Sequence, residues 1–226
     1  MRGRAVGCKE RGKRERARPP GGCAAMRGFM LAAVILSGGA SERMGSPKAL
    51  LPFQGRPFLE HLLEVTKHPR VSVRRVVLGA HAEPIAKAVA LTTDEIVINQ
   101  DWAKGQLSSI QAALRSLPAG TEGILLCLVD HPLVTAALIA ELIARFEATH
   151  ALIVVPVHEG RRGHPVIFSA AVYDELLSAP ADKGARAVVW AHAGEVAEVL
   201  TDEEGCLLNL NDPETLQRAT GRMDQR

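Results

Sequence analysis

The sequence predicts an α/β protein of three layers, in which helices cover both faces of a mostly parallel sheet. Short apolar runs that suit buried strands alternate with segments in which apolar residues recur at helical spacing. Parallel strands need crossover connections, so this alternation favours a mostly parallel sheet. The length of 226 residues suits one domain of about 200 residues.

The predicted elements follow one another along the chain. Strands are predicted at 31–36, 73–78, 95–98, 123–129 and 151–156. Residues 123–129 are the most apolar, as expected for a central strand buried on both faces. Helices are predicted from Pro57 onward, over 84–91, after Gly105 and over 135–146.

Charge is distributed unevenly along the chain. Residues 1–25 carry eight Arg or Lys and two Glu, a net of +6, so the remaining residues sum to −4. This segment has little apolar content and is followed closely by a folded pattern. We therefore predict a disordered basic extension over residues 1–27 and one domain over 28–226. A nucleic-acid-binding arm is the alternative, but we expect no nucleic-acid partner.

The cysteines and the apolar segments limit the compartment. Cys8, Cys23, Cys127 and Cys206 are scattered without a C-x-x-C pair, which predicts neither a zinc site nor a disulfide framework. No apolar stretch approaches the roughly 20 residues of a membrane span, and no secretory signal is recognisable. We expect a protein of the reducing cytoplasm without a membrane partner.

The first predicted strand runs directly into a loop of small residues. Ser37, Gly38, Gly39, Ala40 and Ser41 have backbone N–H groups that an anion can approach closely. Two cations, Arg43 and Lys48, follow on the same loop. Neither the P-loop spacing nor the dinucleotide-binding G-x-G-x-x-G fits this segment. The loop nevertheless predicts a place that holds phosphates.

This segment resembles the signature of the molybdopterin nucleotidyltransferase-like family, L-x-[AG]-G-x-S-x-R-M-G-x-x-K. The matching residues are Leu36, Gly38, Gly39, Ser41, Arg43, Met44, Gly45 and Lys48. The resemblance implies the Rossmann-like nucleotidyltransferase fold. It also implies nucleotide binding by residues 36–39, Ser41, Arg43 and Lys48, and catalytic roles for both cations.

A second stretch resembles the family's N-x-x-[aromatic]-x-x-G-x-x-x-S pattern. Asn99, Trp102, Gly105 and Ser109 stand in register with it. The resemblance implies nucleotide binding by Asn99, Gly105 and Ser109. An ordinary helix-capping serine is the structural alternative.

The predicted central strand ends in Asp130-His131-Pro132, at the edge where α/β sheets bind ligands. The family has D-x-P here, which implies that Asp130 binds Mg²⁺ and is catalytic. We assign no catalytic role to His131.

Near the C-terminus the cytidylyltransferase branch reads D-x-D-T-P, whereas this chain has Asn209, Asn211 and Asp212. Asn211 is thus the candidate second metal ligand, although a hard cation prefers carboxylate. Asp212 is displaced by one position and should point the other way.

Two segments of the second half resemble acceptor-binding segments of the family. Arg161, Gly163, His164 and Pro165 match R-x-G-[HN]-P, and Asp182 to Arg186 match D-x-G-A-R of the cytidylyltransferase branch. The resemblance implies acceptor contacts from Arg161, Gly163, His164, Pro165, Asp182 and Arg186.

Taken together, the resemblance implies Mg²⁺-dependent transfer of a nucleoside monophosphate from a triphosphate to molybdopterin, with release of pyrophosphate. Gly38 is typical of the guanine branch, but the longer match to the cytidine branch favours CTP. The alternatives are a GTP-dependent guanylyltransferase, a sugar-phosphate nucleotidyltransferase and a non-catalytic cofactor carrier. A molybdoenzyme that receives the product is an expected partner.

Overall fold

The computed structural model describes residues 30–40 and 46–223 of the chain. The predicted extension over 1–27, and the site residues Ser41 and Arg43, lie outside the described residues. The predicted first strand is confirmed as β1 (Leu31–Ser37), in which all seven residues are buried. It pairs in parallel with β4 (Val71–Leu78) on one side and β6 (Gly123–Leu128) on the other.

The main sheet has the strand order β10-β7-β9-β6-β1-β4-β5, and β8 pairs with β7. The further strands are β5 (Ile96–Ile98), β7 (Ile153–His158), β8 (Arg161–Arg162), β9 (Val166–Ser169) and β10 (Val196–Leu200). The pairs β1–β4, β1–β6, β4–β5 and β7–β10 are parallel, which confirms a mostly parallel sheet. Strand β9 runs antiparallel to both of its neighbours. The connection from β7 to β9 is too short for a parallel crossover.

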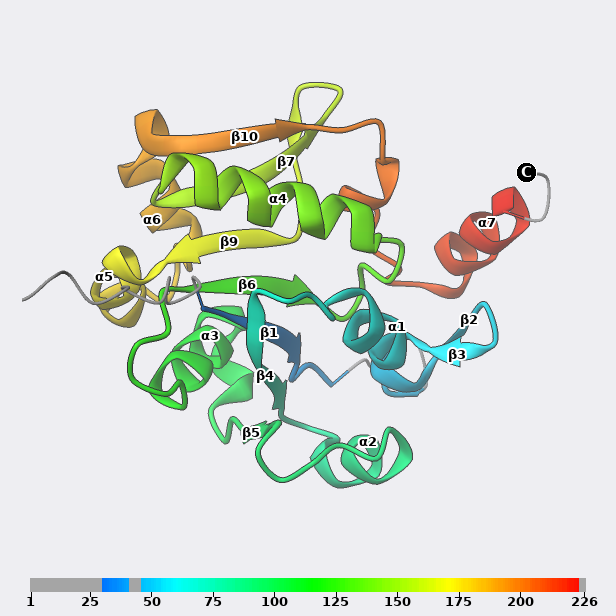
Figure 1. The fold of residues 1–226 in the computed structure, drawn as a ribbon. Helices are drawn as coiled ribbons and strands as arrows, with labels where there is room; N and C mark the ends of the chain where they lie inside the picture. The colour runs from blue at the N-terminus through cyan, green and yellow to red at the C-terminus, as the bar shows by residue number, and fades with distance from the viewer. Residues whose placement is uncertain (1–29, 41–45, 224–226) are drawn as a thin grey trace, which may run out of the picture.

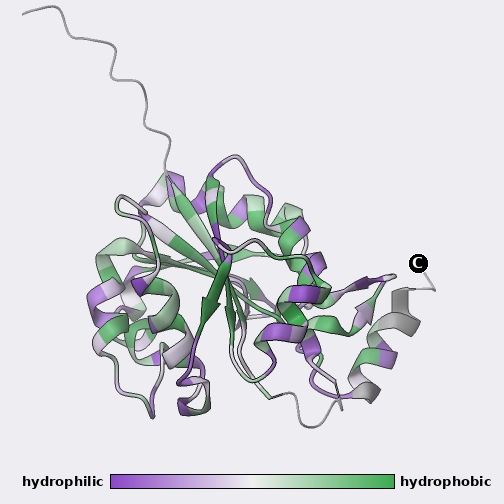
Figure 2. Ribbon diagram, turned by 90° about the horizontal axis from the view of Figure 1, so that it is seen from below, coloured by the Kyte–Doolittle hydropathy of each residue, from purple (hydrophilic) through white to green (hydrophobic). Residues whose placement is uncertain are grey.

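Helices cover both faces of the sheet (Figure 1). One core lies between the sheet and the helices α1 (Phe58–Val65), α2 (Ala82–Ala88) and α4 (Ala136–Thr149). The other lies under α3 (Gln106–Arg115), α5 (Tyr173–Ser178) and α6 (Arg186–Ala191). Successive residues of β1 alternate between the two cores, and Figure 2 shows hydrophobic residues along the strands between the helix layers.

Short elements connect these layers. The hairpin β2 (Pro52–Phe53) and β3 (Arg56–Pro57) turns at Gln54 and Gly55, both with positive φ. Pro57 therefore ends this hairpin, and α1 begins one residue later than predicted. The described residues also form the short 3-10 helices η2 (Lys48–Leu50), η3 (Trp102–Lys104), η4 (Ala170–Val172), η5 (Ala193–Glu195) and η6 (Glu204–Cys206).

The chain ends in α7 (Pro213–Met223), which packs on the first core through Ala219 and Leu216. Within the described ranges, no helix is both long and apolar enough to span a membrane.

Candidate functional site

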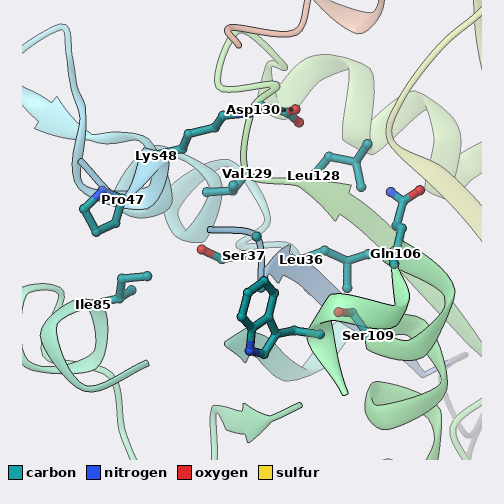
Figure 3. A pocket seen from close by; sticks show the side chains of 14 residues that line it. Leu36, Ser37, Pro47, Lys48, Ile85, Gln106, Ser109, Leu128, Val129 and Asp130 are labelled. Atoms are coloured by element: carbon teal, nitrogen blue, oxygen red, sulfur yellow. Dashed lines mark ion pairs between the residues drawn. The ribbon is translucent and has the colours of Figure 1, made fainter. Parts of the chain in front are cut away.

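A cavity of about 290 Å³ opens beyond the carboxyl ends of β1 and β6 and beside the start of α3 (Figure 3). This is the edge at which open α/β sheets bind ligands. The structure brings eight of the predicted site residues together in its lining: Leu36, Ser37, Gly38, Gly39, Lys48, Gly105, Ser109 and Asp130. Three segments that are distant in sequence therefore form one site.

One end of the cavity carries the charged groups. The Nζ of Lys48 lies 3.8 Å from Oδ2 of Asp130, and these two side chains are only 19% and 21% exposed. Lys48 also donates a hydrogen bond to Oδ1 of Asn211. The backbone N–H of Leu210 donates to the backbone oxygen of Asp130 at 2.7 Å, which holds the C-terminal segment against the end of β6. Asn211 thus lies beside Asp130.

The carboxylate of Asp212 is directed elsewhere. Its Oδ1 accepts hydrogen bonds from the backbone N–H and the hydroxyl of Thr215, both at 2.8 Å. This is an N-cap interaction at the start of α7, where Pro213 is the first helical residue. Asp212 therefore caps a helix while its neighbour Asn211 contacts Lys48.

The resemblance implies that a divalent ion binds at Asp130. A hard cation prefers oxygen ligands, and Asp130 and Asn211 supply one carboxylate and one amide oxygen at the same place. Among the described residues, no cluster of three or more His, Cys, Asp or Glu side chains is arranged to hold a metal. The residues present therefore fit an ion that takes its remaining ligands from phosphates and water, not a fully protein-enclosed metal.

The other end of the cavity is formed by the glycine loop and the start of α3. A Cβ added to Gly38 would lie 3.2 Å from Oγ of Ser109 and 3.7 Å from Cβ of Trp102. The absence of a side chain at Gly38 therefore keeps this end of the cavity wide. Gly105 has a φ of 99°, which allows the chain to turn sharply into α3.

Asn99 supports this end without lining the cavity. Its Nδ2 donates to Oγ of Ser108 at 2.8 Å and to Oγ of Ser109 at 3.0 Å. Its Oδ1 accepts from the backbone N–H of Asp101 at 2.9 Å. Because a backbone N–H only donates, this contact fixes the orientation of the amide. Asn99 is thus a buried residue that holds Ser109 in the cavity wall.

The lining also includes residues to which the sequence analysis assigned no role in the site: Pro47, Ile85, Trp102, Gln106, Leu128 and Val129. In Figure 3 the side chain of Gln106 extends from α3 toward Leu128, on the same side of the site as Ser109. Trp102 belongs to the matched sequence pattern, and Gln106 directly follows Gly105, so their positions in the sequence could have indicated that both residues belong to the site. Ile85 lies on α2 and becomes a neighbour only through the fold.

Part of the predicted acceptor segment lies close to Asp130. The rings of His164 and His131 are 5.2 Å apart between centroids, and Nε2 of His131 is 3.9 Å from Oδ1 of Asp130. His164 is held by its backbone N–H, which donates to the oxygen of Cys206 at 2.8 Å. A Cβ at Gly163 would lie 2.5 Å from that same oxygen, so the contact requires glycine.

Burial decides the charge of these two histidines. It lowers the pKa of His164 to about 4, with a smaller contribution from the neighbouring His131. Burial also lowers the pKa of His131, while the charge of Asp130 opposes the shift. Both rings are therefore neutral at pH 7, and each has an Nδ1 atom without a hydrogen-bond partner among the described residues.

The remaining acceptor candidates are placed differently. Pro165 is buried and follows His164, whereas Arg161 is exposed on β8. Asp182 and Arg186 lie near the amino ends of the parallel strands, whereas the cavity lies at their carboxyl ends. In this region α6 leads into the start of β10 (Figure 1). There the guanidinium of Arg186 lies 5.7 Å from the ring centroid of Trp190. The structure does not bring Asp182 and Arg186 to the cavity.

Comparison with known families agrees with this arrangement. Residues 33–196 match the model described as the MobA-like NTP transferase domain, which is well over half of the chain. The chain belongs to this family. The Rossmann-like nucleotidyltransferase fold and the molybdopterin nucleotidyltransferase-like family predicted from the sequence are therefore confirmed.

Three relatives show how broad this MobA-like family is. The chain is 31% identical over 190 residues to a molybdenum cofactor guanylyltransferase of Cereibacter sphaeroides, covering 82% of this chain and 93% of that one. It is 33% identical over 162 residues to the nicotine blue oxidoreductase of Paenarthrobacter nicotinovorans, covering 68% and 78%. The crystal structure of Rv0371c from Mycobacterium tuberculosis superposes with a TM-score of 0.74 at 29% identity, covering 87% and 100%.

A further crystal structure of Rv0371c is a complex with manganese, at 27% identity and a TM-score of 0.67, covering 85% of this chain and 98% of that one. A divalent ion therefore occurs in a protein of the same fold.

Proposed function

We propose that this protein transfers a nucleoside monophosphate from a nucleoside triphosphate, preferably CTP, to the phosphate of molybdopterin and releases pyrophosphate. One observation carries the proposal. Lys48, Asp130 and Asn211 lie together at the charged end of the cavity, beside the glycine loop. A cation and oxygen ligands beside a bare backbone loop suit a triphosphate with its metal ion.

For this reaction the protein mainly has to position the two substrates and neutralise the charge of the phosphates. An oxygen of the acceptor phosphate forms a bond to the α-phosphorus, and the bond from that phosphorus to the β-phosphate breaks, so that pyrophosphate leaves. The acceptor oxygen is already anionic at neutral pH, and no general base is needed.

Four side chains have roles in this mechanism. Lys48 neutralises the phosphates, and we expect Arg43 to add a second cation. Asp130 would hold Mg²⁺, with the side-chain oxygen of Asn211 as the candidate second ligand, and the bound ion would neutralise charge on the phosphates. The amide is a weaker ligand than a carboxylate, so the protein should need more Mg²⁺ than one with two carboxylates.

We assign the acceptor to the side of Asp130 on which Gly163, His164 and Pro165 lie. Nδ1 of His131 and Nδ1 of His164 are buried and have no hydrogen-bond partner within the described part of the chain. The two rings are in contact, and Nε2 of His131 lies 3.9 Å from Oδ1 of Asp130. Contacts from Arg161, Asp182 and Arg186 stay predictions. A molybdoenzyme remains the expected recipient of the product. The two described cysteines, Cys127 and Cys206, are free thiols, which suits a reducing cytoplasm.

The choice of base depends on the end of the cavity near Gly38. An added methyl there would approach Ser109 to 3.2 Å, and the narrower space should disfavour a purine. We expect the unmodified protein to prefer CTP over GTP modestly and Gly38→Ala to raise that preference roughly fivefold to tenfold. Gly194→Ala is the control, because Gly194 does not line the cavity, its methyl would meet no atom within 4 Å, and the preference should not change.

A redox reaction is the second candidate, favoured by the relative named nicotine blue oxidoreductase. The same cavity could hold a nucleotide that donates hydride to a bound acceptor. The single carboxylate at Asp130, with an amide at Asn211, is compatible with nucleotide binding without transfer. A sugar-phosphate acceptor and a non-catalytic carrier of the cofactor are the further alternatives.

These candidates are separated by one set of incubations. The purified protein is mixed with Mg²⁺, each of the four triphosphates in turn, and molybdopterin or a sugar phosphate, and pyrophosphate is followed. We expect release that requires molybdopterin, with the highest kcat/KM for CTP. A higher kcat/KM for GTP would overturn the choice of base. A parallel incubation contains a reduced nicotinamide nucleotide in place of the triphosphate, and its consumption, with no pyrophosphate released in the other incubations, would favour the redox reaction.

A further inference from the structure

The glycine loop after β1 is held by a second loop, residues 79–81, between β4 and α2. Gly79 lies so close to the glycine loop that a Cβ there would collide with the carbonyl oxygen of Gly38. The next residue, Ala80, donates its backbone N–H to that same carbonyl at 3.3 Å. Gly79 and Ala80 therefore hold the carbonyl group of Gly38 in place.

His81 continues this contact to the far end of the described part of the glycine loop. Its Nε2 lies 2.9 Å from the carbonyl oxygen of Ala40. A carbonyl oxygen only accepts, so Nε2 carries the hydrogen in this contact. Ala40 is the last described residue before 41–45, and His81 is partly buried.

We propose that His81 is a positioning residue for the triphosphate site. A carbonyl oxygen carries partial negative charge, and one that turned toward the phosphates would repel them, whereas backbone N–H groups attract them. The hydrogen bond from His81 keeps the Ala40 carbonyl directed at the ring of His81. The inference rests on the proposed triphosphate site and adds a residue that touches neither the cavity nor the reacting atoms.

The test compares His81→Leu with His81→Gln, in which the side-chain amide can still donate. Binding of Mg-CTP, Mg-GTP, inorganic tripolyphosphate and the free nucleosides is followed by tryptophan fluorescence, because Trp102 lines the cavity. We expect His81→Leu to bind the triphosphates and tripolyphosphate about tenfold more weakly, as for loss of one hydrogen bond in a charged site. Nucleoside binding should not change, and Gln should restore most of the loss.

His61 provides the matched control. Its Nε2 contacts the carbonyl oxygen of Phe53 in the same manner, but at the β2–β3 hairpin and not at the cavity. His61→Leu should leave all four ligands unaffected. Equal weakening of nucleosides and triphosphates by His81→Leu, or triphosphate affinity within twofold of the unmodified protein, would overturn the proposal.

The same measurements separate this proposal from the proposed reaction. Triphosphate binding that depends on His81, without any release of pyrophosphate, would sustain the positioning role and contradict nucleotidyl transfer. Failure of the unmodified protein to bind any triphosphate or tripolyphosphate would overturn both.

Discussion

At the scale of single residues, Asp130 is the carboxylate that lies beside both Lys48 and Asn211. Replacing it with Asn keeps the size of the side chain and removes the negative charge that would hold the metal. We expect Asp130→Asn to lower the rate of pyrophosphate release at least about a hundredfold, a loss of roughly 3 kcal/mol of transition-state stabilisation. Steady-state rates with saturating Mg²⁺ and triphosphate measure the effect.

Asp212→Asn is the matched control for charge. Asp212 caps α7 through Thr215, so the substitution should cost a few tenths of a kcal/mol to about 1 kcal/mol in stability and leave turnover nearly unchanged. Turnover of Asp130→Asn within a few-fold of the unmodified protein would remove Asp130 from the mechanism.

Asn211→Asp tests the second ligand. The side-chain oxygen of Asn211 already accepts a hydrogen bond from Lys48 beside Asp130. A carboxylate at this position should lower the Mg²⁺ concentration for half-maximal rate about threefold to tenfold, because hard cations prefer charged oxygen ligands. Asn209→Asp adds the same charge at an exposed position nearby and should have little effect. An unchanged Mg²⁺ dependence in Asn211→Asp would exclude this residue as a ligand.

The sequence predicts individual residues well where strand, loop and charged group are close together in the chain. Gly38 and Gly39 directly follow one apolar strand and Asp130 comes just after another, and all three line the cavity. Asn99 is different, because it does not line the cavity and its side chain bonds to Ser108, Ser109 and Asp101. Its contact with the nucleotide stays a prediction.

At the scale of elements, the glycine loop depends on close packing against residues 79–81. A methyl at Gly79 would collide with the Gly38 carbonyl and lie 2.6 Å from Cβ of Trp102. Because one of these atoms is backbone, neither loop can yield cheaply, and we expect Gly79→Ala to lower the free energy of unfolding by about 1–3 kcal/mol.

Urea denaturation measures this loss, and Gly194→Ala is its control, because a Cβ at Gly194 would meet no atom within 4 Å. Gly79→Ala with the stability of the unmodified protein would show that the two loops are less tightly packed than described.

The elements of the first half follow closely from hydrophobic periodicity, with shifts of one to a few residues at their ends. Strand β9 shows what periodicity leaves open, because its direction depends on the length of a loop and not on its own residues. Its antiparallel pairing with β6 and β7 follows from the short connection through β8.

At the scale of the whole molecule, the buried histidines link folding to pH. Burial lowers the pKa of His164 to about 4, whereas an unfolded chain has a value of about 6.5. As pH falls from about 6.5 toward 4, the unfolded state binds a proton that the folded state does not. The free energy of unfolding therefore decreases over this range, by as much as about 3 kcal/mol.

His164→Asn should therefore flatten the decrease in stability between these pH values, as measured by urea denaturation at several pH values. His150→Asn is the control, since His150 is an exposed residue with positive φ at the end of α4, a conformation that Asn tolerates. An equal decrease in His164→Asn and the unmodified protein would show that His164 does not stay neutral on folding.

Residues far apart in the chain mark the limit of prediction at this scale. Asn211 reaches Lys48 from 163 positions away, and only the resemblance suggested that the two segments meet. Asp182 and Arg186 were expected at the acceptor, but α6 and η5 precede β10 and so lie at the amino ends of the parallel strands. Whether a loop lies at the amino ends or at the carboxyl ends of the parallel strands depends on the direction of the strand that follows it.

The central claim is that the cavity joins a nucleoside monophosphate to a phosphorylated acceptor. Mass spectrometry of molybdopterin after incubation with the protein, Mg²⁺ and CTP tests this most directly. We expect an acceptor heavier by one cytidine monophosphate, formed together with one pyrophosphate, and we expect Asp130→Asn to abolish it. Unmodified molybdopterin in the presence of bound CTP, or free cytidine monophosphate alone, would contradict it.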